Sequence, residues 1–355
     1  MSILKILSIG DPHFKSDNSL ETDLMVSRIK DLIDVENPNI IVVLGDTLHY
    51  HERIPMYTLH RATLFIKMLS DTNRNVYILI GNHDRPNNNI FLTDEHAFNS
   101  FKEWKNITII DDVTVVSEIA NDNNYYNLLL VPYVPLGRFN EALLTKSLKH
   151  PLNDISIVFC HQEWQGCKIN LINESKADVW PLDAPFNCSG HIHDYEKVQS
   201  NLIYPGTPIQ HSPSDVTNKT VSILNMTFKS QGILSFMNER RISLNIPHKI
   251  SITLTPEKLL DFVLPELFSS IRIRIECSSS TYKGLMELNE IKKLQNIFGV
   301  KIIHINIDLF KLSKSSYMSL EENVMISYDK RLGLAISNYS ENINKIHKYF
   351  LSLPH

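Results

Sequence analysis

The first ninety residues alternate between short apolar runs and longer stretches in which apolar residues recur every three or four positions. Apolar runs at 4–11, 40–46 and 76–80 predict buried strands, and the helical spacing within 21–36 and 55–69 predicts amphipathic helices between them. The resulting β-α-β-α-β order predicts a largely parallel sheet with helices packed on it.

Strand patterns continue after residue 90, whereas helical patterns become sparse. Strands are predicted at 106–110, 127–133, 155–160, 186–190, 202–206 and 220–226. We expect this half of the chain to form a second sheet stacked on the first. The predicted fold class is therefore α/β, with two stacked mixed β-sheets flanked by helices.

A smaller unit follows the change of composition near 244–249. Its pattern predicts a strand at 271–277, a helix around 285–298 and a strand at 300–308. These elements form a β-α-β unit, which we interpret as a small α+β domain.

The remaining residues are mostly helical in pattern, and Ile343, Ile346 and Phe350 recur on one face. These residues suit either docking on a partner or packing on the chain's own domain. We predict three parts: a large domain over 1–243, a capping domain over 244–310 and a helical C-terminal tail over 311–355.

Composition narrows the class of protein. The chain has 355 residues, of which 43% are hydrophobic and 21% charged, values that are ordinary for a folded soluble protein. Its net charge of −4 argues against nucleic-acid binding through bulk positive charge. The four cysteines, Cys160, Cys167, Cys188 and Cys277, show no CxxC spacing, and no apolar run is long enough to span a membrane. We expect a cytoplasmic or otherwise intracellular protein without membrane contact.

Side chains that can bind metal ions follow the ends of five predicted strands. They are Asp11 and His13 in GDPH, Asp46 and His49 in GDTLH, Asn82, His83 and Asp84 in GNHD, His161 in CHQE, and His191 and His193 in GHIH. Because ligands gather outside the carboxyl ends of strands in such sheets, we expect these side chains to meet at one rim.

Seven of these residues are the candidate ligands: Asp11, His13, Asp46, Asn82, His161, His191 and His193. They offer oxygen and nitrogen donors and no thiolate, which suits Mn²⁺, Fe²⁺ or Zn²⁺. Seven donors exceed the needs of one tetrahedral ion but fit two ions that share a carboxylate. Taken singly, Asp46 could be a turn residue or helix N-cap, and GHIH a pair of surface histidines. The order of the motifs favours a joint metal site.

With these motifs in order, the chain resembles the calcineurin-like metallophosphoesterases, whose series runs DxH, GDxxx, GNHD/E, H and GHxH. Within that superfamily it looks most like the SbcD-type nuclease subunit of DNA double-strand-break repair. Three features carry this likeness: His49 three residues after Asp46, the apolar strand at 127–133 that runs into Pro-aromatic, and the PGTPI turn after GHIH. The resemblance covers about residues 4–225.

The resemblance implies a four-layer sandwich with two divalent metal ions, Mn²⁺ first and Mg²⁺, Fe²⁺ or Zn²⁺ as alternatives. It assigns one ion to Asp11, His13, Asp46 and His193, and the other to Asp46, Asn82, His161 and His191. It also implies that His83 is the general acid, that Asp84 orients its ring, and that His49 positions the scissile phosphate.

The implied function is that of a DNA exonuclease and endonuclease in double-strand-break repair and recombination. The capping domain would help select DNA, the tail would dock on the coiled coil of an SMC-like ABC ATPase, and a homodimer is left open. Lys15, Arg53, Arg85 and residues 238–241 could add local positive charge, although solvated surface is the commoner fate of such groups.

Two alternatives belong to other classes. A stand-alone phosphodiesterase or phosphatase for nucleotides or other small phosphate esters would use the same chemistry. A non-catalytic scaffold is disfavoured, because every ligand position is filled and His83 is present.

Overall fold

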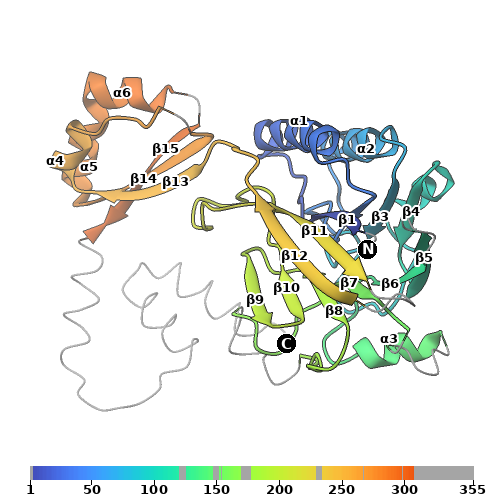
Figure 1. Cartoon of the computed structure of the whole chain (residues 1–355). Coiled ribbons are helices and arrows are strands. Elements are labelled where there is room, and N and C mark those ends of the chain that lie inside the picture. The colour runs from blue at the N-terminus through green and yellow to red at the C-terminus, as the bar shows by residue number, and fades with distance from the viewer. Residues whose placement is uncertain are drawn as a thin grey trace, which may run out of the picture.

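The described residues fold into two six-stranded sheets and a separate three-stranded sheet (Figure 1). The computed structural model describes residues 3–119, 125–146, 152, 154–168, 177–228, 234–266, 268–297 and 299–307. The two larger sheets stack with helices outside them, which confirms the predicted fold class.

The first sheet has the order β12-β11-β1-β2-β3-β4. Its strands are β1 (Ile3–Ile9), β2 (Ile40–Val43), β3 (Asn75–Leu79), β4 (Ile107–Ile110), β11 (Val221–Phe228) and β12 (Leu234–Ile242). Strands β1 to β4 are parallel, and β11 runs antiparallel to β1. The helices α1 (Ser19–Glu36) and α2 (Met56–Ser70) cover the outer face, and a short 3₁₀ helix (Asn99–Glu103) precedes β4.

The second sheet has the order β5-β6-β7-β8-β10-β9. Its strands are β5 (Thr114–Ile119), β6 (Tyr125–Val131), β7 (Ile157–His161), β8 (Phe186–Gly190), β9 (Glu196–Gln199) and β10 (Leu202–Tyr204). Helix α3 (Phe139–Thr145) packs on its outer face with Trp164 and Trp180.

Apolar side chains fill both faces of the central strands. In β1, Leu4 and Ile6 pack between the two sheets, whereas Leu7 and Ile9 pack under the helices. Burial on both faces explains why these strands are continuous apolar runs in the sequence rather than alternating ones.

The structure corrects several details of the predicted elements. The strands at 106–110 and 220–226 belong to the first sheet, as β4 and β11, because pairing is decided by contacts far apart in the chain. Strands β5, β9 and β12 were not predicted. Each lies at the edge of its sheet, where a strand needs no continuous apolar run, so the pattern did not reveal it. Helix α3 was also missed, and Pro55 precedes α2 rather than lying within its first turn.

The third sheet consists of the parallel strands β13 (Lys249–Leu254), β14 (Ser270–Cys277) and β15 (Val300–Asn306). Its helices are α4 (Pro256–Leu260), α5 (Ser279–Glu287) and α6 (Asn289–Gln295). The single helix expected around 285–298 is thus two, because Leu288 between α5 and α6 is extended at ψ 138°. We call residues 249–306 the cap.

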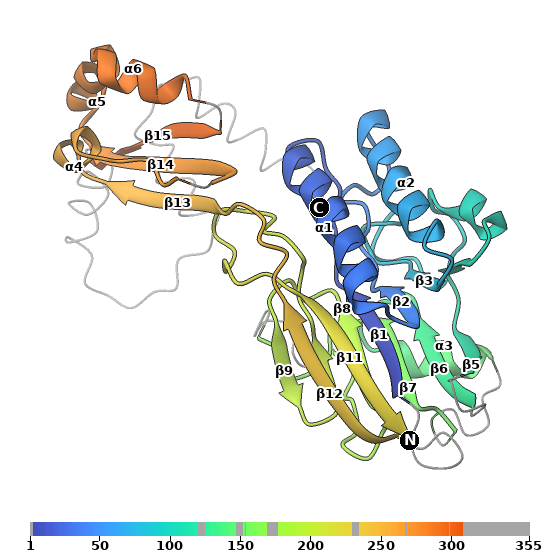
Figure 2. The same cartoon turned by 45° about the horizontal axis from the view of Figure 1, so that its top comes forward.

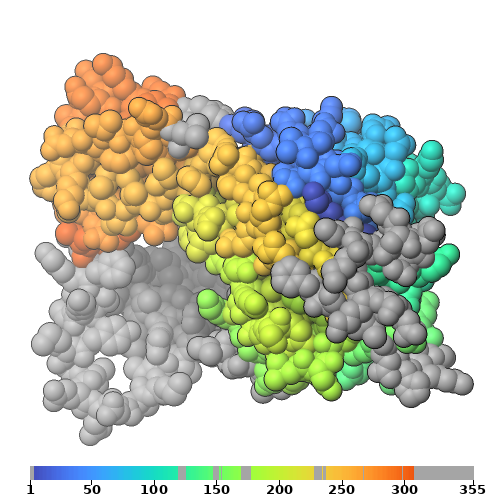
Figure 3. All heavy atoms as spheres, in the orientation of Figure 1, coloured from blue at the N-terminus to red at the C-terminus, as the bar shows by residue number. Residues whose placement is uncertain are grey.

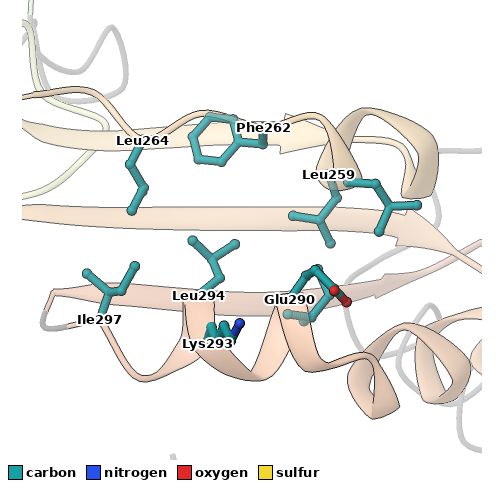
Figure 4. Close-up of a pocket in the computed structure, with 9 residues that line it drawn as sticks. Leu259, Phe262, Leu264, Glu290, Lys293, Leu294 and Ile297 are labelled. Atoms are coloured by element: carbon teal, nitrogen blue, oxygen red, sulfur yellow. The ribbon is translucent and has the colours of Figure 1, made fainter.

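A groove of about 250 Å³ opens in the cap between the segment that follows α4 and helix α6 (Figure 4). Leu259, Phe262 and Leu264 line one side, and Leu294 and Ile297 line the other. None of the predicted metal or catalytic residues contributes to it.

The cap leaves the body at the end where the predicted site residues lie. Strand β12 is antiparallel to β11, which is antiparallel to β1, so β12 ends at the same rim as β1. Figure 2 shows this connection, and Figure 3 shows the cap standing to one side of the body. None of the helices in the described ranges is long and apolar enough to cross a membrane. The predicted tail over 311–355 lies outside the described residues.

Candidate metal centre

The predicted metal ligands lie at the carboxyl ends of five strands, three from the first sheet and two from the second. They follow β1, β2, β3 and β8 and include the last residue of β7. Asp11, His13, Asp46, Asn82 and His161 are almost fully buried, whereas His191 and His193 are partly exposed. The two stacked sheets thus bring distant segments to one place, as the motifs predicted.

Three donors converge in one half of the centre. The Oδ1 atom of Asn82 lies 3.0 Å from Nε2 of His161 and 3.0 Å from Nδ1 of His191, and these two nitrogens are 3.3 Å apart. The other ring nitrogen of His161, Nδ1, donates to the carbonyl oxygen of Leu44 at 2.7 Å. That hydrogen bond leaves the lone pair of Nε2 directed at the centre, as a metal-binding histidine requires.

Two histidines form the other half. The Nε2 atoms of His13 and His193 are 3.1 Å apart. Oδ2 of Asp46 lies 3.5 Å from Nε2 of His13 and 3.5 Å from Nε2 of His161. Asp46 therefore stands between the two halves, in the place of a shared carboxylate.

Asp11 is buried within the same centre. Its carboxylate accepts the backbone N–H of His191 at 3.0 Å, and Oδ1 is 3.6 Å from Nδ1 of His161. These contacts involve the His191 backbone and the His161 nitrogen that faces Leu44, so the assignment of Asp11 to the ion of His13 stays a prediction. Burial raises the pKa of Asp11 to about 7, an effect that His161 opposes and Asp46 reinforces.

The backbone at the centre is held in unusual conformations. His13, Asp46 and His191 have φ angles of 45°, 46° and 85°, a left-handed region that non-glycine residues rarely occupy. Such strain clusters at functional sites, where surrounding contacts enforce it. The glycine of GNHD serves these ligands directly, because a Cβ on Gly81 would lie 2.2 Å from Oδ1 of Asp46.

The donor set fits divalent cations. Burial lowers the pKa of His193 to about 4 and that of His13 well below its usual value, so both imidazoles are neutral and able to bind metal. Two carboxylates buried together are costly without compensating positive charge. Among the residues that the structure describes, two sets of three each bring their donor atoms within 4.8 Å of one another. They are Asp46, His161 and His191, and His13, His49 and His83. The first agrees with the prediction, whereas the second adds His49 and His83 to His13.

His83 sits at the edge of this centre. Its backbone N–H donates to Oδ1 of Asp46 at 2.8 Å, and its ring Nδ1 donates to the carbonyl oxygen of His49 at 2.9 Å. The rings of His49 and His83 are nearly parallel, with centroids 5.3 Å apart. Nδ1 of His49 lies 3.3 Å from Nδ1 of His13. The predicted acid and the predicted phosphate-positioning residue are therefore neighbours.

The expectation that Asp84 orients the ring of His83 is wrong. Its carboxylate accepts three backbone N–H groups, from Gly81, Thr47 and Leu48, at 3.0, 3.2 and 2.8 Å. The carbonyl of His49 contacts the His83 ring instead. Asp84 thus ties the loop after β2 to the loop after β3, and it positions Asp46 through the backbone.

Three further residues of the centre were not predicted. His211 packs its ring 4.7 Å from that of His13 and 5.2 Å from that of His193, and its Nε2 donates to the carbonyl oxygen of Asp11. His51 stacks on His83, and Glu163 lies 3.8 Å from Nε2 of His191. The signals were present, since all three fall in or beside the motifs GDTLHYH, CHQE and PGTPIQH.

Most of the cations considered for DNA contact are engaged within the protein. Arg85 is buried and donates to the carbonyl oxygens of Tyr133, Ile90 and Phe91, so it is a structural residue. Lys15 donates to the carbonyl oxygen of His211. Arg240 pairs with Glu36, and Arg241 lies over the ring of Tyr195. Arg53 and Arg240 are the exposed cations among these residues.

Comparisons with known proteins agree with this geometry. The family profile described as calcineurin-like phosphoesterase matches residues 4–195. Protein 244L of Invertebrate iridescent virus 6 is 35% identical over 291 residues, which are 79% of this chain and 95% of that protein. Protein 078R of Invertebrate iridescent virus 3 is 40% identical over 221 residues, which are 62% of each chain, so the match spans less than two thirds of that relative. Both relatives carry the word phosphoesterase in their names.

Two solved structures have weaker likeness. GAP50, the anchor in the inner membrane complex of Plasmodium, is 15% identical with a TM-score of 0.41, over 68% of this chain and 90% of that one. The 5'-nucleotidase precursor from Thermus thermophilus is 11% identical with a TM-score of 0.39, over 68% of this chain and 54% of that one.

Proposed function

Because the chain belongs to the calcineurin-like phosphoesterase family, we propose that it hydrolyses phosphodiesters at a centre of two divalent cations. The observation that carries this proposal is the position of Asp46. Its Oδ2 is equally distant, at 3.5 Å, from a histidine of each half, and its Oδ1 accepts the backbone N–H of His83. One carboxylate thereby links both ligand groups to the candidate acid.

The residues would divide into two sets of ligands joined by Asp46. Asp11, His13 and His193 would hold one ion, and Asn82, His161 and His191 would hold the other. Two divalent cations bound there would act as Lewis acids on the phosphoryl oxygens and lower the pKa of an attacking water. We propose Mn²⁺ as the working ion, with Mg²⁺, Fe²⁺ and Zn²⁺ as alternatives.

His83 is the proposed general acid. The hydrogen bond from its Nδ1 to the carbonyl of His49 fixes the ring and leaves Nε2 to deliver a proton to the leaving oxygen. A phosphodiester of two alcohols leaves as an alkoxide, so proton donation matters most for such substrates. His49 would contact the scissile phosphate, and its position beside both His13 and His83 supports this proposal.

DNA is the proposed substrate, and the face of the cap sheet that lies opposite the cap helices supports it. Ile271, Ile273 and Ile275 of β14 are buried beneath the cap helices. Because side chains alternate along a strand, Arg272 and Arg274 lie on the opposite face. Lys301 is in register with Arg272 and shares that face. Three cations on one sheet face suit a phosphate backbone.

A small phosphate ester is the second candidate, favoured by the electrostatics of the centre itself. Arg85 is buried, and Lys15 is held by the His211 carbonyl and by Asp17. Near the proposed metal ligands, few cationic side chains among the described residues are therefore available to contact a long polyanion. A stand-alone phosphodiesterase for nucleotides would need no more than the centre provides.

We extend the DNA proposal to partners of this chain. An SMC-like ABC ATPase would bind the segment 311–355, whose apolar residues Ile343, Ile346 and Phe350 share helical spacing. A homodimer would form through α2, where Met56 and Tyr57 are 80% and 60% exposed. Deleting 335–355 should abolish co-purification with the ATPase and leave hydrolysis of a small diester intact. Co-purification of the truncated chain would contradict the docking proposal.

The substrate experiment compares linear duplex DNA, single-stranded DNA and thymidine 5'-(p-nitrophenyl phosphate), each with Mn²⁺-loaded protein. The DNA proposal predicts degradation of DNA and slower turnover of the small ester. The double variant Arg272→Glu/Arg274→Glu should lose its activity on DNA and keep its activity on the small ester. Turnover of the small ester with intact DNA, with and without the ATPase, would favour the second candidate.

A further inference from the structure

His51 lies beside His83 without belonging to either set of metal ligands. Its ring is nearly parallel to that of His83, with centroids 4.7 Å apart and an angle of 22° between the planes. Favourable aromatic pairs have ring centroids about 4.5–7 Å apart, and the two rings of such a pair keep a preferred mutual orientation. The side chain of His51 is partly exposed, so it stands at the solvent edge of the centre.

Two hydrogen bonds cross between the loop of His51 and the loop of His83. The ring of His83 donates from Nδ1 to the carbonyl oxygen of His49, at 2.9 Å. The ring of His51 donates from Nδ1 to the carbonyl oxygen of Arg85, at 3.0 Å. Each loop therefore supplies one imidazole donor and one carbonyl acceptor to the other loop. The two rings that donate these hydrogen bonds also stack on each other.

The anchor of His51 is rigid. Arg85 is 2% exposed, and its guanidinium donates to the carbonyl oxygens of Tyr133 and Ile90 at 2.6 and 2.7 Å and also to that of Phe91. Because the His51 ring is bonded to this backbone, it can restrict the rotation of the His83 ring. Proton transfer depends strongly on the placement of the donor, so such restriction bears on the rate of reaction.

We propose that His51 is a positioning residue that holds the His83 ring in its proton-donating orientation through ring stacking. This inference rests on the proposed role of His83 as general acid. It assigns a function to the second histidine of HYH, which lies outside both sets of metal ligands and acts on the reaction only through its neighbour.

The test uses two substrates that share a nucleoside and differ in the leaving group. The dinucleotide TpT releases an alkoxide and needs an acid, whereas thymidine 5'-(p-nitrophenyl phosphate) releases a phenolate and does not. Steady-state kcat and KM are measured for wild type, His83→Gln, His51→Ala, His51→Phe and the matched control His60→Ala. His60 is an exposed histidine of α2. Bound Mn²⁺ and thermal midpoints are recorded for each variant.

His51→Ala should lower kcat for TpT by about tenfold, which corresponds to the energy of one stacked pair. The KM for TpT and the kcat for the aryl ester should stay unchanged. His51→Phe should restore kcat for TpT to within about threefold of wild type, because it keeps a ring against His83. His60→Ala should behave as wild type. Equal losses on both substrates, or no difference between Ala and Phe, would overturn the role of His51. If His83→Gln itself fails to discriminate between the substrates while hydrolysis remains cation-dependent, the acid assignment fails and the inference with it.

Discussion

The carboxylate of Asp46 accepts the backbone N–H of His83 at 2.8 Å. This hydrogen bond connects the residue that stands between the two ligand groups with the proposed general acid. Because Oδ1 is used for it, Oδ2 is the atom that faces His13 and His161. Changes at Asp46 should therefore affect metal binding and proton transfer together.

Asp46→Asn should remove the shared negative charge and reduce the number of bound cations. We expect kcat/KM to fall by roughly 10³-fold, since the cations contribute several kcal/mol of transition-state stabilisation. Metal analysis of the purified variant checks this directly. Wild-type metal content with wild-type activity would contradict the placement of Asp46 between the two sites.

Asp84→Asn tests the corrected role of that residue. Three backbone N–H groups lose a charged acceptor, so the free energy of unfolding should fall by about 1–3 kcal/mol. Metal affinity should weaken as the loops after β2 and β3 loosen. Activity on TpT and on the aryl ester should fall by the same factor. A loss confined to TpT would show that Asp84 acts through the His83 ring after all.

Gly81→Ala tests the space beside Asp46. The added Cβ would lie 2.2 Å from Oδ1 and the same distance from the backbone nitrogen of Asp46, so the carboxylate must move. We expect loss of metal binding and activity. Gly284→Ala is the matched control. Apart from its chain neighbours and the backbone of its own helix, a Cβ there would meet no described atom within 4 Å, and α5 should gain up to about 1 kcal/mol. A fully active Gly81→Ala protein would contradict the described geometry.

Asp111 gives a pH test of stability away from the metal centre. Burial raises its pKa, but hydrogen bonds from His96 and Lys102 outweigh burial, and the net pKa is lowered. A carboxylate with a lowered folded-state pKa stabilises the fold above its unfolded-state pKa, and this stabilisation is lost as pH falls through the folded-state value. Asp111→Asn should cost about 1 kcal/mol at neutral pH, a value kept small by solvent screening.

Denaturant titrations of both proteins between neutral and acidic pH measure this difference. The two unfolding curves should converge below the folded-state pKa of Asp111. A difference that persists unchanged in acid would exclude the ionic contribution.

The local motifs allowed the convergence of the proposed ligands at one rim to be predicted, because each of them ends a buried strand or follows one within a few residues. Sheet membership was harder, since β4 and β11 are indistinguishable from strands of the second sheet by periodicity alone. Edge strands such as β12 carry polar residues and were missed. Two of the three partners of Asp84, Thr47 and Leu48, could not be predicted, because they belong to a loop that the fold brings across from another strand. His211 is 200 residues from Asp11, and only folding places them together.

The most direct test of the two-cation phosphodiesterase is a titration of Mn²⁺ into metal-free protein. Calorimetry would follow binding while hydrolysis of thymidine 5'-(p-nitrophenyl phosphate) is measured on matched samples. We expect two bound ions per chain, with activity rising as the second site fills. Full activity with one bound ion, or no activity with two, would contradict catalysis by two cations.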